Sequence, residues 1–149
     1  MDTESLLKLL NAHDVRYVVI GASALPVHGF VRATLDMDIL IEPTHENGEK
    51  ILKALKEFGY DLSAVRLEDI LYKKVLLRQY LVETDIHPFV KGADFKTVWK
   101  TKVKSKYGDT PVFFAGLDAL IAMKKAANRP KDKEDLKYLE EVKRRRDKK

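Results

Sequence analysis

The 149-residue sequence contains no cysteine. The chain therefore forms no disulfide and offers no thiolate for a zinc site or for nucleophilic catalysis. It also lacks any apolar run near the roughly 20 residues that a membrane-spanning helix needs. Residues 1–15 carry acids among leucines, rather than the basic start and apolar stretch of a secretory signal. We therefore expect a protein of the cytoplasm with no membrane partner.

The sequence also shows no internal repeat, no low-complexity linker and no sign of a second domain. With 45% hydrophobic and 34% charged residues, the composition is typical of a globular protein that buries a core without disulfides. We expect one domain over residues 1–149.

The net charge of +5 is unevenly distributed. Residues 143–149 hold six basic groups and one acidic group, so this stretch alone carries +5 and the remaining residues are neutral. A neutral body argues against a domain that coats nucleic acid with its whole surface. The basic stretch is interpreted as a solvated helix end or tail, with phosphate contact as the alternative.

Hydrophobic periodicity predicts alternating helices and strands. We expect an opening helix that ends near residue 13, and further helices near 22–28, 44–58, 94–100, 117–127 and 130–145. Strands are expected near 17–20, 35–41, 72–79, 81–87, 102–107 and 110–114. The predicted fold class is α/β (α+β), a small mixed β-sheet flanked by helices.

Two aspartates, Asp36 and Asp38, lie in the strand predicted at 35–41, where apolar residues alternate with them. Side chains at i and i+2 of a strand point to the same side, with Cα atoms roughly 6.5–7 Å apart. Two like charges at that separation are unfavourable unless a cation lies between them, and a divalent metal ion is the usual solution. The alternative is a solvent-facing pair near a strand end, which the flanking apolar residues disfavour.

The run Gly21-Ala22-Ser23 follows the strand predicted at 17–20. A glycine between a strand and a helix lets backbone N–H groups face a ligand, and a helix N-terminus favours an anion such as phosphate. Ser23 adds a hydroxyl. Such turns are common in α/β proteins, and this one becomes specific because the Asp36-x-Asp38 strand follows it.

Together, residues 20–23 and 32–39 resemble the signature of the polymerase-β-like nucleotidyltransferase superfamily, in which a hydrophobic-Gly-Gly/Ala-Ser turn precedes an Asp-x-Asp strand. A small branch that includes abortive-infection toxins is similar at further positions. These are His28-Gly29, Arg32-x-Thr34, residues 117–124 and residues 129–135. The resemblance spans about residues 16–140 and implies a nucleotidyltransferase fold.

The resemblance implies that Asp36 and Asp38 ligate Mg²⁺, or Mn²⁺ in its place, and that a third carboxylate completes a two-metal site. Asp85 is the preferred third carboxylate, and in the family this residue also helps to remove the proton from the acceptor hydroxyl. Glu83 is the competing candidate, because Glu83, Asp85 and His87 share one face of the strand predicted at 81–87.

The resemblance also implies that Gly21 and Ser23 hold a triphosphate. Arg32 is a further candidate for phosphate binding, with an ion pair to Asp36 or a contact to a helix end as the alternative. Lys124 falls on the apolar stripe of its predicted helix. A lysine there either extends to solvent or points into a site that binds an anion, and we assign it to the triphosphate.

Other polar residues have structural interpretations. His28 and His87 are expected to orient or pack, with substrate contact as the alternative. The group Arg129, Lys131, Asp132 and Asp135 surrounds a predicted helix start and is interpreted as an ion-pair network.

The leading hypothesis is an Mg²⁺-dependent enzyme that moves a nucleoside monophosphate from a nucleoside triphosphate, such as ATP, to a hydroxyl of RNA, protein or a small molecule. The rival hypothesis is a catalytically weak binding or regulatory module that pairs with another protein, as in a toxin–antitoxin pair. Ala22, where many active members have a second glycine, favours the rival, as does the lack of a separate acceptor-binding domain.

Overall fold

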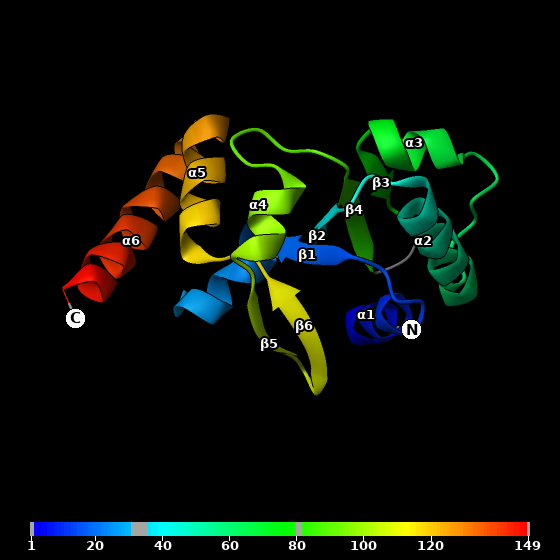
Figure 1. The fold of residues 1–149 in the computed structure, drawn as a ribbon, viewed down its shortest axis with the longest axis horizontal. Coiled ribbons are helices and arrows are strands. Elements are labelled where there is room, and N and C mark those ends of the chain that lie inside the picture. Colours follow the sequence, from blue (N-terminus) through cyan, green and yellow to red (C-terminus); the bar gives the residue numbers. More distant parts are fainter. Residues whose placement is uncertain (1, 31–35, 80–81, 149) are drawn as a thin grey trace.

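The computed structural model describes residues 2–30, 36–79 and 82–148. Within these ranges, helices and strands alternate along the chain (Figure 1). In order, they are α1 (Thr3–Ala12), β1 (Tyr17–Ile20), the 3₁₀ helix η1 (Gly21–His28), β2 (Asp36–Ile41), α2 (His45–Phe58), α3 (Leu67–Tyr72), β3 (Val75–Leu77), β4 (Glu83–His87), α4 (Phe95–Lys100), β5 (Val103–Tyr107), β6 (Thr110–Phe114), α5 (Leu117–Ala127) and α6 (Pro130–Asp147).

The strands form a six-stranded mixed sheet in the order β3-β4-β2-β1-β6-β5. Strand β2 lies between β1, to which it is antiparallel, and β4, to which it is parallel. In Figure 1, α5 and α6 lie side by side at one end of the molecule, and α1, α2 and α3 lie at the other. The predicted mixed sheet flanked by helices is confirmed.

The sequence-based boundaries are wrong in the region after α2. Helix α3 was not predicted, and β3 covers only Val75–Leu77 instead of the strand expected at 72–79. Six residues give too short an apolar pattern to separate a helix from a strand. The backbone N–H of Arg66 donates to the Asp69 carboxylate over 2.9 Å, which closes the first turn of α3.

The helix predicted at 22–28 is confirmed in position, but it is a 3₁₀ helix that begins at Gly21. Pro26 lies inside it and supplies no N–H for a helical hydrogen bond. Gly29 ends the helix with a φ of 86°, and its N–H donates to the Pro26 carbonyl over 3.0 Å. This short, tight element therefore starts directly at the glycine of the turn.

Part of the core lies on the face of the sheet opposite the two aspartates of β2. Met37 and Ile39 alternate with Asp36 and Asp38, so they point to the other side, where both are buried. The same apolar cluster includes the helical residues Leu6, Leu7, Leu10, Ile51 and Leu55. Burial of this face fixes the register of β2, because a slip of one residue would turn its carboxylates into the core.

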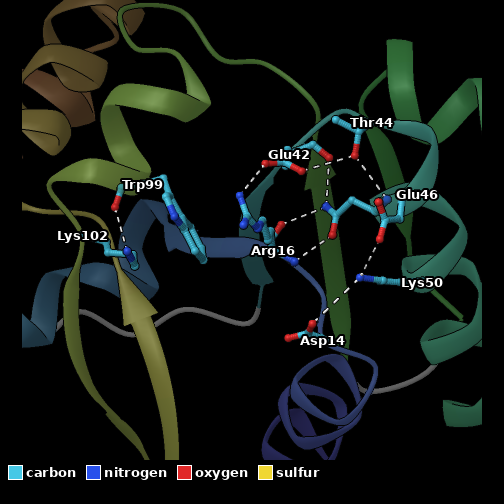
Figure 2. Close-up of polar contacts among 9 residues, drawn as sticks. Asp14, Arg16, Glu42, Thr44, Glu46, Lys50, Trp99 and Lys102 are labelled. Atoms are coloured by element: carbon cyan, nitrogen blue, oxygen red, sulfur yellow. Dashed lines mark hydrogen bonds and ion pairs between the residues drawn. The ribbon is translucent and has the colours of Figure 1, made fainter.

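Asn47, a buried residue of α2, connects the starts of β1 and α2 to the end of β2. Its side-chain oxygen accepts the N–H of Arg16 over 2.8 Å, and its amide nitrogen donates to the carbonyls of Arg16 (3.0 Å) and Glu42 (2.9 Å). Figure 2 shows Arg16, Glu42 and Thr44 close to one another. The Arg16 guanidinium lies 3.1 Å from the Glu42 carboxylate. The junction holds the β1–β2 pair in register at the end away from the aspartates.

Most of the basic stretch at the C-terminus is helical, because α6 continues to Asp147. Lys143 and Arg146 lie 3.3 and 3.5 Å from the carboxylate of Asp118 on α5. These exposed ion pairs each contribute little to stability, but they direct two of the basic groups toward α5. No helix in residues 2–30, 36–79 and 82–148 combines the length and the apolar character needed to cross a lipid bilayer.

Candidate active site

Strand pairing gathers four carboxylates and an imidazole on one face of the sheet. Asp36 lies opposite Glu83 and Asp38 lies opposite Asp85 in the parallel β2–β4 pair. His87 follows on β4, two residues after Asp85. Because alternate residues of a strand share a face, all five side chains point to the side away from Met37 and Ile39.

The turn at Gly21 lies directly against Asp38. Gly21 has a φ of +68°, and a Cβ built on it would lie 2.8 Å from the Asp38 carboxylate. The hydroxyl of Ser23 donates to the backbone carbonyl of Asp36 over 3.2 Å. The predicted turn and the predicted carboxylates are therefore brought together, with Ser23 bonded to the β2 backbone.

Arg78, which follows β3, binds three of the carboxylates. Its Nη1 donates to the Asp85 carboxylate, its Nη2 lies 3.8 Å from Asp36, and its Nε lies 3.7 Å from Glu83. The hydrogen bond to Asp85 raises the pKa of the Arg78 guanidinium. Arg78 was not among the residues predicted from the sequence. A lone arginine after a short strand gives no local signal, and only the β3–β4 pairing brings it to this face.

Glu83 lies opposite Asp36, and this neighbour changes the pKa of Glu83. A hydrogen bond with Asp36, together with burial and the charge of Asp36, raises the pKa of Glu83. Asp85 lies deeper, at 5% exposure, and has the arginine as its partner. The two candidates for the third carboxylate therefore have different surroundings, and Asp85 is the one opposite Asp38.

Asp38, Asp85 and His87 offer ligand atoms that all lie within 4.8 Å of one another. The Nε2 of His87 donates to the Asp38 carboxylate over 2.9 Å. The carboxylates of Asp38 and Asp85 are donors that a divalent cation accepts, because carboxylate oxygens suit Mg²⁺ and Mn²⁺, and an imidazole bonded to one of them can orient it. The residues present therefore fit a metal of this class. The sequence predicted an orienting or packing role for His87, with substrate contact as the alternative, and its hydrogen bond to Asp38 agrees with an orienting role.

Lys124 takes part in an ion-pair network between α5 and α6. Its ammonium lies 3.3 Å from the Asp132 carboxylate and 3.0 Å from that of Asp135. Burial raises the pKa of Asp132, but hydrogen bonds from Arg129 and Lys124 outweigh it and bring the pKa to about 2. The predicted network around the start of α6 is confirmed for Arg129, Asp132 and Asp135.

Two further groups of predicted residues are not part of the carboxylate cluster as the structure describes it. The ring of His28 contacts the Ala115 carbonyl through Nε2 at 3.0 Å, in keeping with an orienting role. Arg32 and Thr34 lie outside the described residues.

A cavity of about 770 Å³ covers the carboxylate face. One wall carries acidic groups and the glycine turn, including Gly21, Asp36, Asp38 and Asp85. The lining also includes cations, namely Lys74, Lys91, Lys124, Arg129 and Lys131. This volume lies in the usual range for small-molecule sites. A cavity lined by both acidic and basic side chains suits a metal ion bound to a polyphosphate. The acidic groups can bind the metal, and the basic groups can bind the phosphates.

A family model described as "Nucleotidyltransferase of unknown function (DUF6036)" matches residues 1–144. The chain belongs to this family. The match contains the glycine turn, both aspartates of β2, and Asp85 and His87 of β4. Membership confirms the nucleotidyltransferase resemblance expected from the sequence. The comparison with curated proteins finds no match.

Proposed function

We propose that this member of the nucleotidyltransferase family transfers a nucleoside monophosphate from a nucleoside triphosphate to a hydroxyl group, with Mg²⁺ or Mn²⁺ as the cofactor. Family membership gives the class of activity. The observation that supports the rest is the pairing of Asp38 with Asp85, directly beside Gly21. This arrangement puts acidic ligands and an open backbone turn on the same cavity wall.

Asp36, Asp38 and Asp85 are the residues proposed to hold the metal. Two bound cations would stabilise the attacking and leaving oxygens of an in-line displacement at the α-phosphate. Asp85 would accept the proton of the acceptor hydroxyl, and the support for this role is that its carboxylate lines the cavity. His87 would keep the Asp38 carboxylate oriented through their hydrogen bond.

Within the protein itself, the Arg78 guanidinium supplies the positive charge next to these carboxylates. Its guanidinium bridges Asp36, Glu83 and Asp85, and it remains 38% exposed. Metal binding would therefore require the guanidinium to move away from Asp85, and its exposure toward solvent leaves room for that movement. Arg78 relieves repulsion among the acids until a cation replaces it.

The triphosphate would lie between the turn and the cations that line the cavity. Gly21 leaves the backbone accessible, and Arg129 and Lys131 line the same cavity. Lys124 also faces the cavity, although Asp132 and Asp135 already neutralise part of its charge. Ser23 and Arg32 remain predictions for triphosphate binding.

The test is pyrophosphate release from several nucleoside triphosphates with Mg²⁺ or Mn²⁺, in the presence of RNA, protein and small-molecule acceptor pools. We expect release that Asp38→Asn lowers at least 100-fold. Asp14→Asn is the matched control, because Asp14 is 97% exposed and does not line the cavity. Absence of release under all conditions, together with no metal-dependent triphosphate binding, would overturn the proposal.

Arg78 also favours a second candidate function, because it occupies carboxylates that catalysis would need. In this alternative the protein is a catalytically weak module that partners another protein, as in a toxin–antitoxin pair. Calorimetry separates the two. Triphosphate binding that requires Mg²⁺ and is lost in Asp36→Asn supports the enzyme. Tight binding of a protein partner that Asp36→Asn leaves unchanged supports the module.

A further inference from the structure

Phe89 is an aromatic side chain exposed inside the candidate active site. Its exposed fraction is 66%, and it lines the same cavity as Asp85 and His87. Within the described residues, the other large exposed hydrophobic side chains are Tyr72 and Leu76, and neither lines this cavity. A single exposed apolar side chain needs no explanation by itself, but one that lines a candidate active site offers an apolar contact to a ligand bound there.

The exposure of Phe89 does not come from a loosely held segment. Figure 1 shows the connection between β4 and α4 running toward α5. Gly92 in this connection has a φ of +90°, and a Cβ on it would lie 2.5 Å from the Ala122 carbonyl of α5. Val90 forms a β-bridge with Ala93, and both pack against the core. The backbone around Phe89 is therefore anchored while its ring faces the cavity.

Phe89 is not the only apolar residue in the lining. Leu120 and Met123 of α5 also line the cavity, and Gly92, three residues after Phe89, packs against Ala122 of the same helix. Phe89 comes four residues after Asp85, so the two Cα atoms are at most about 14 Å apart along the chain. Ribose and base extend away from the α-phosphate of a nucleotide. With its α-phosphate at the carboxylates, a nucleotide could thus place its base against these apolar residues.

We propose that Phe89 stacks on the nucleobase of the bound nucleoside triphosphate. This inference rests on the proposed function and names the part of the substrate that Phe89 recognises. Stacking on an aromatic side chain needs only a planar ring, so it accepts any base. Purines should bind more tightly than pyrimidines, because their two fused rings cover more of the phenyl group.

The test compares two ligands by calorimetry in the presence of Mg²⁺: a nucleoside triphosphate with a non-hydrolysable α,β-methylene link, and inorganic tripolyphosphate. Phe89→Ala should weaken binding of the nucleotide by roughly 5- to 150-fold and leave tripolyphosphate binding unchanged. Phe89→Trp should keep the nucleotide affinity, because it preserves a stacking surface. Tyr72→Ala is the matched control, since Tyr72 is 67% exposed but lies outside the cavity lining.

Each other outcome overturns the inference in a distinguishable way. Equal loss of both ligands in Phe89→Ala would assign Phe89 to the phosphate site or to local folding. Unchanged binding of both ligands would exclude stacking but leave the proposed function intact. If the unaltered protein binds neither ligand with Mg²⁺ or Mn²⁺, the proposed function fails and the stacking fails with it.

Discussion

A Cβ atom on Gly21 would lie 2.8 Å from the carboxylate oxygen Oδ2 of Asp38. Two constraints therefore require glycine at this position, the positive φ of the backbone and the space taken by the carboxylate. The turn after β1 and the acidic strand β2, which are separate motifs in the sequence, form one structural unit. The position of the Gly21 turn therefore sets the position of the Asp38 carboxylate.

Gly21→Ala should affect both the stability of the protein and its triphosphate binding. We expect a loss of about 1–3 kcal/mol in the free energy of unfolding from backbone strain, and at least a tenfold loss in Mg²⁺-dependent triphosphate affinity from displacement of Asp38. Gly59→Ala is the control, because Gly59 has a φ of 113° and caps α2. The control should lose stability but keep the affinity. Equal affinity for Gly21→Ala and the unaltered protein would contradict the coupling of turn and carboxylate.

Arg78→Ala should make divalent cations bind more tightly. The guanidinium competes with a metal for Asp36 and Asp85, so its removal should raise Mn²⁺ affinity about tenfold, equivalent to about 1.4 kcal/mol. The metal-free variant should unfold at a lower temperature than the unaltered protein, because its carboxylates repel one another. Calorimetric titration with Mn²⁺ and thermal unfolding with and without the metal measure the two effects.

The control for that experiment is Arg145→Ala, which removes an exposed ion pair with Glu141 on α6. It should change neither metal affinity nor the thermal response to metal. Weaker Mn²⁺ binding in Arg78→Ala would show that the arginine supports the metal site rather than competing for it.

Asp132 should stabilise the protein in a pH-dependent way. Its pKa is about 2 in the folded chain, below the ordinary value of 3.8. The stabilisation is therefore complete above pH 3.8 and is lost as the pH falls toward 2. A shift of this size corresponds to about 2 kcal/mol, at about 1.4 kcal/mol per pKa unit.

Asp132→Asn should accordingly lower the free energy of unfolding by about 2 kcal/mol at pH 7, measured by urea denaturation. The difference between variant and unaltered protein should shrink steadily between pH 4 and pH 2. Asp118→Asn, at an exposed position of α5, serves as the control and should show a much smaller effect. If the difference in the free energy of unfolding stays constant across this pH range, Asp132 stabilises the protein through packing and not through its charge.

Local sequence patterns were sufficient to predict the parts of the site that lie within single elements. The alternation around Asp36 and Asp38 specified both the strand and the face of its carboxylates. Gly21 marked the turn, because a glycine between a strand and a helix is itself a conformational signal. Register then followed from burial, since only one face of β2 can hold Met37 and Ile39.

Residues whose roles depend on pairing between elements could not be predicted. Arg78 reaches the carboxylates only because β3 pairs with β4, and a three-residue strand has no recognisable period. Asn47 connects α2 to two strands through backbone groups that the sequence does not identify. The exposure of Phe89 follows from the packing of Gly92 against α5, a contact between segments about 30 residues apart.

His87 should control metal affinity through Asp38, because its Nε2 donates to the Asp38 carboxylate over 2.9 Å. Loss of a hydrogen bond that orients a metal ligand typically lowers affinity about 10- to 100-fold. We therefore expect His87→Ala to weaken Mn²⁺ binding within that range, and His87→Gln to retain most of it through an amide donor. His13→Ala is the matched control, because His13 instead pairs with Glu57, at 2.6 Å. Equal Mn²⁺ affinity in His87→Ala and the control would show that Asp38 needs no orienting partner.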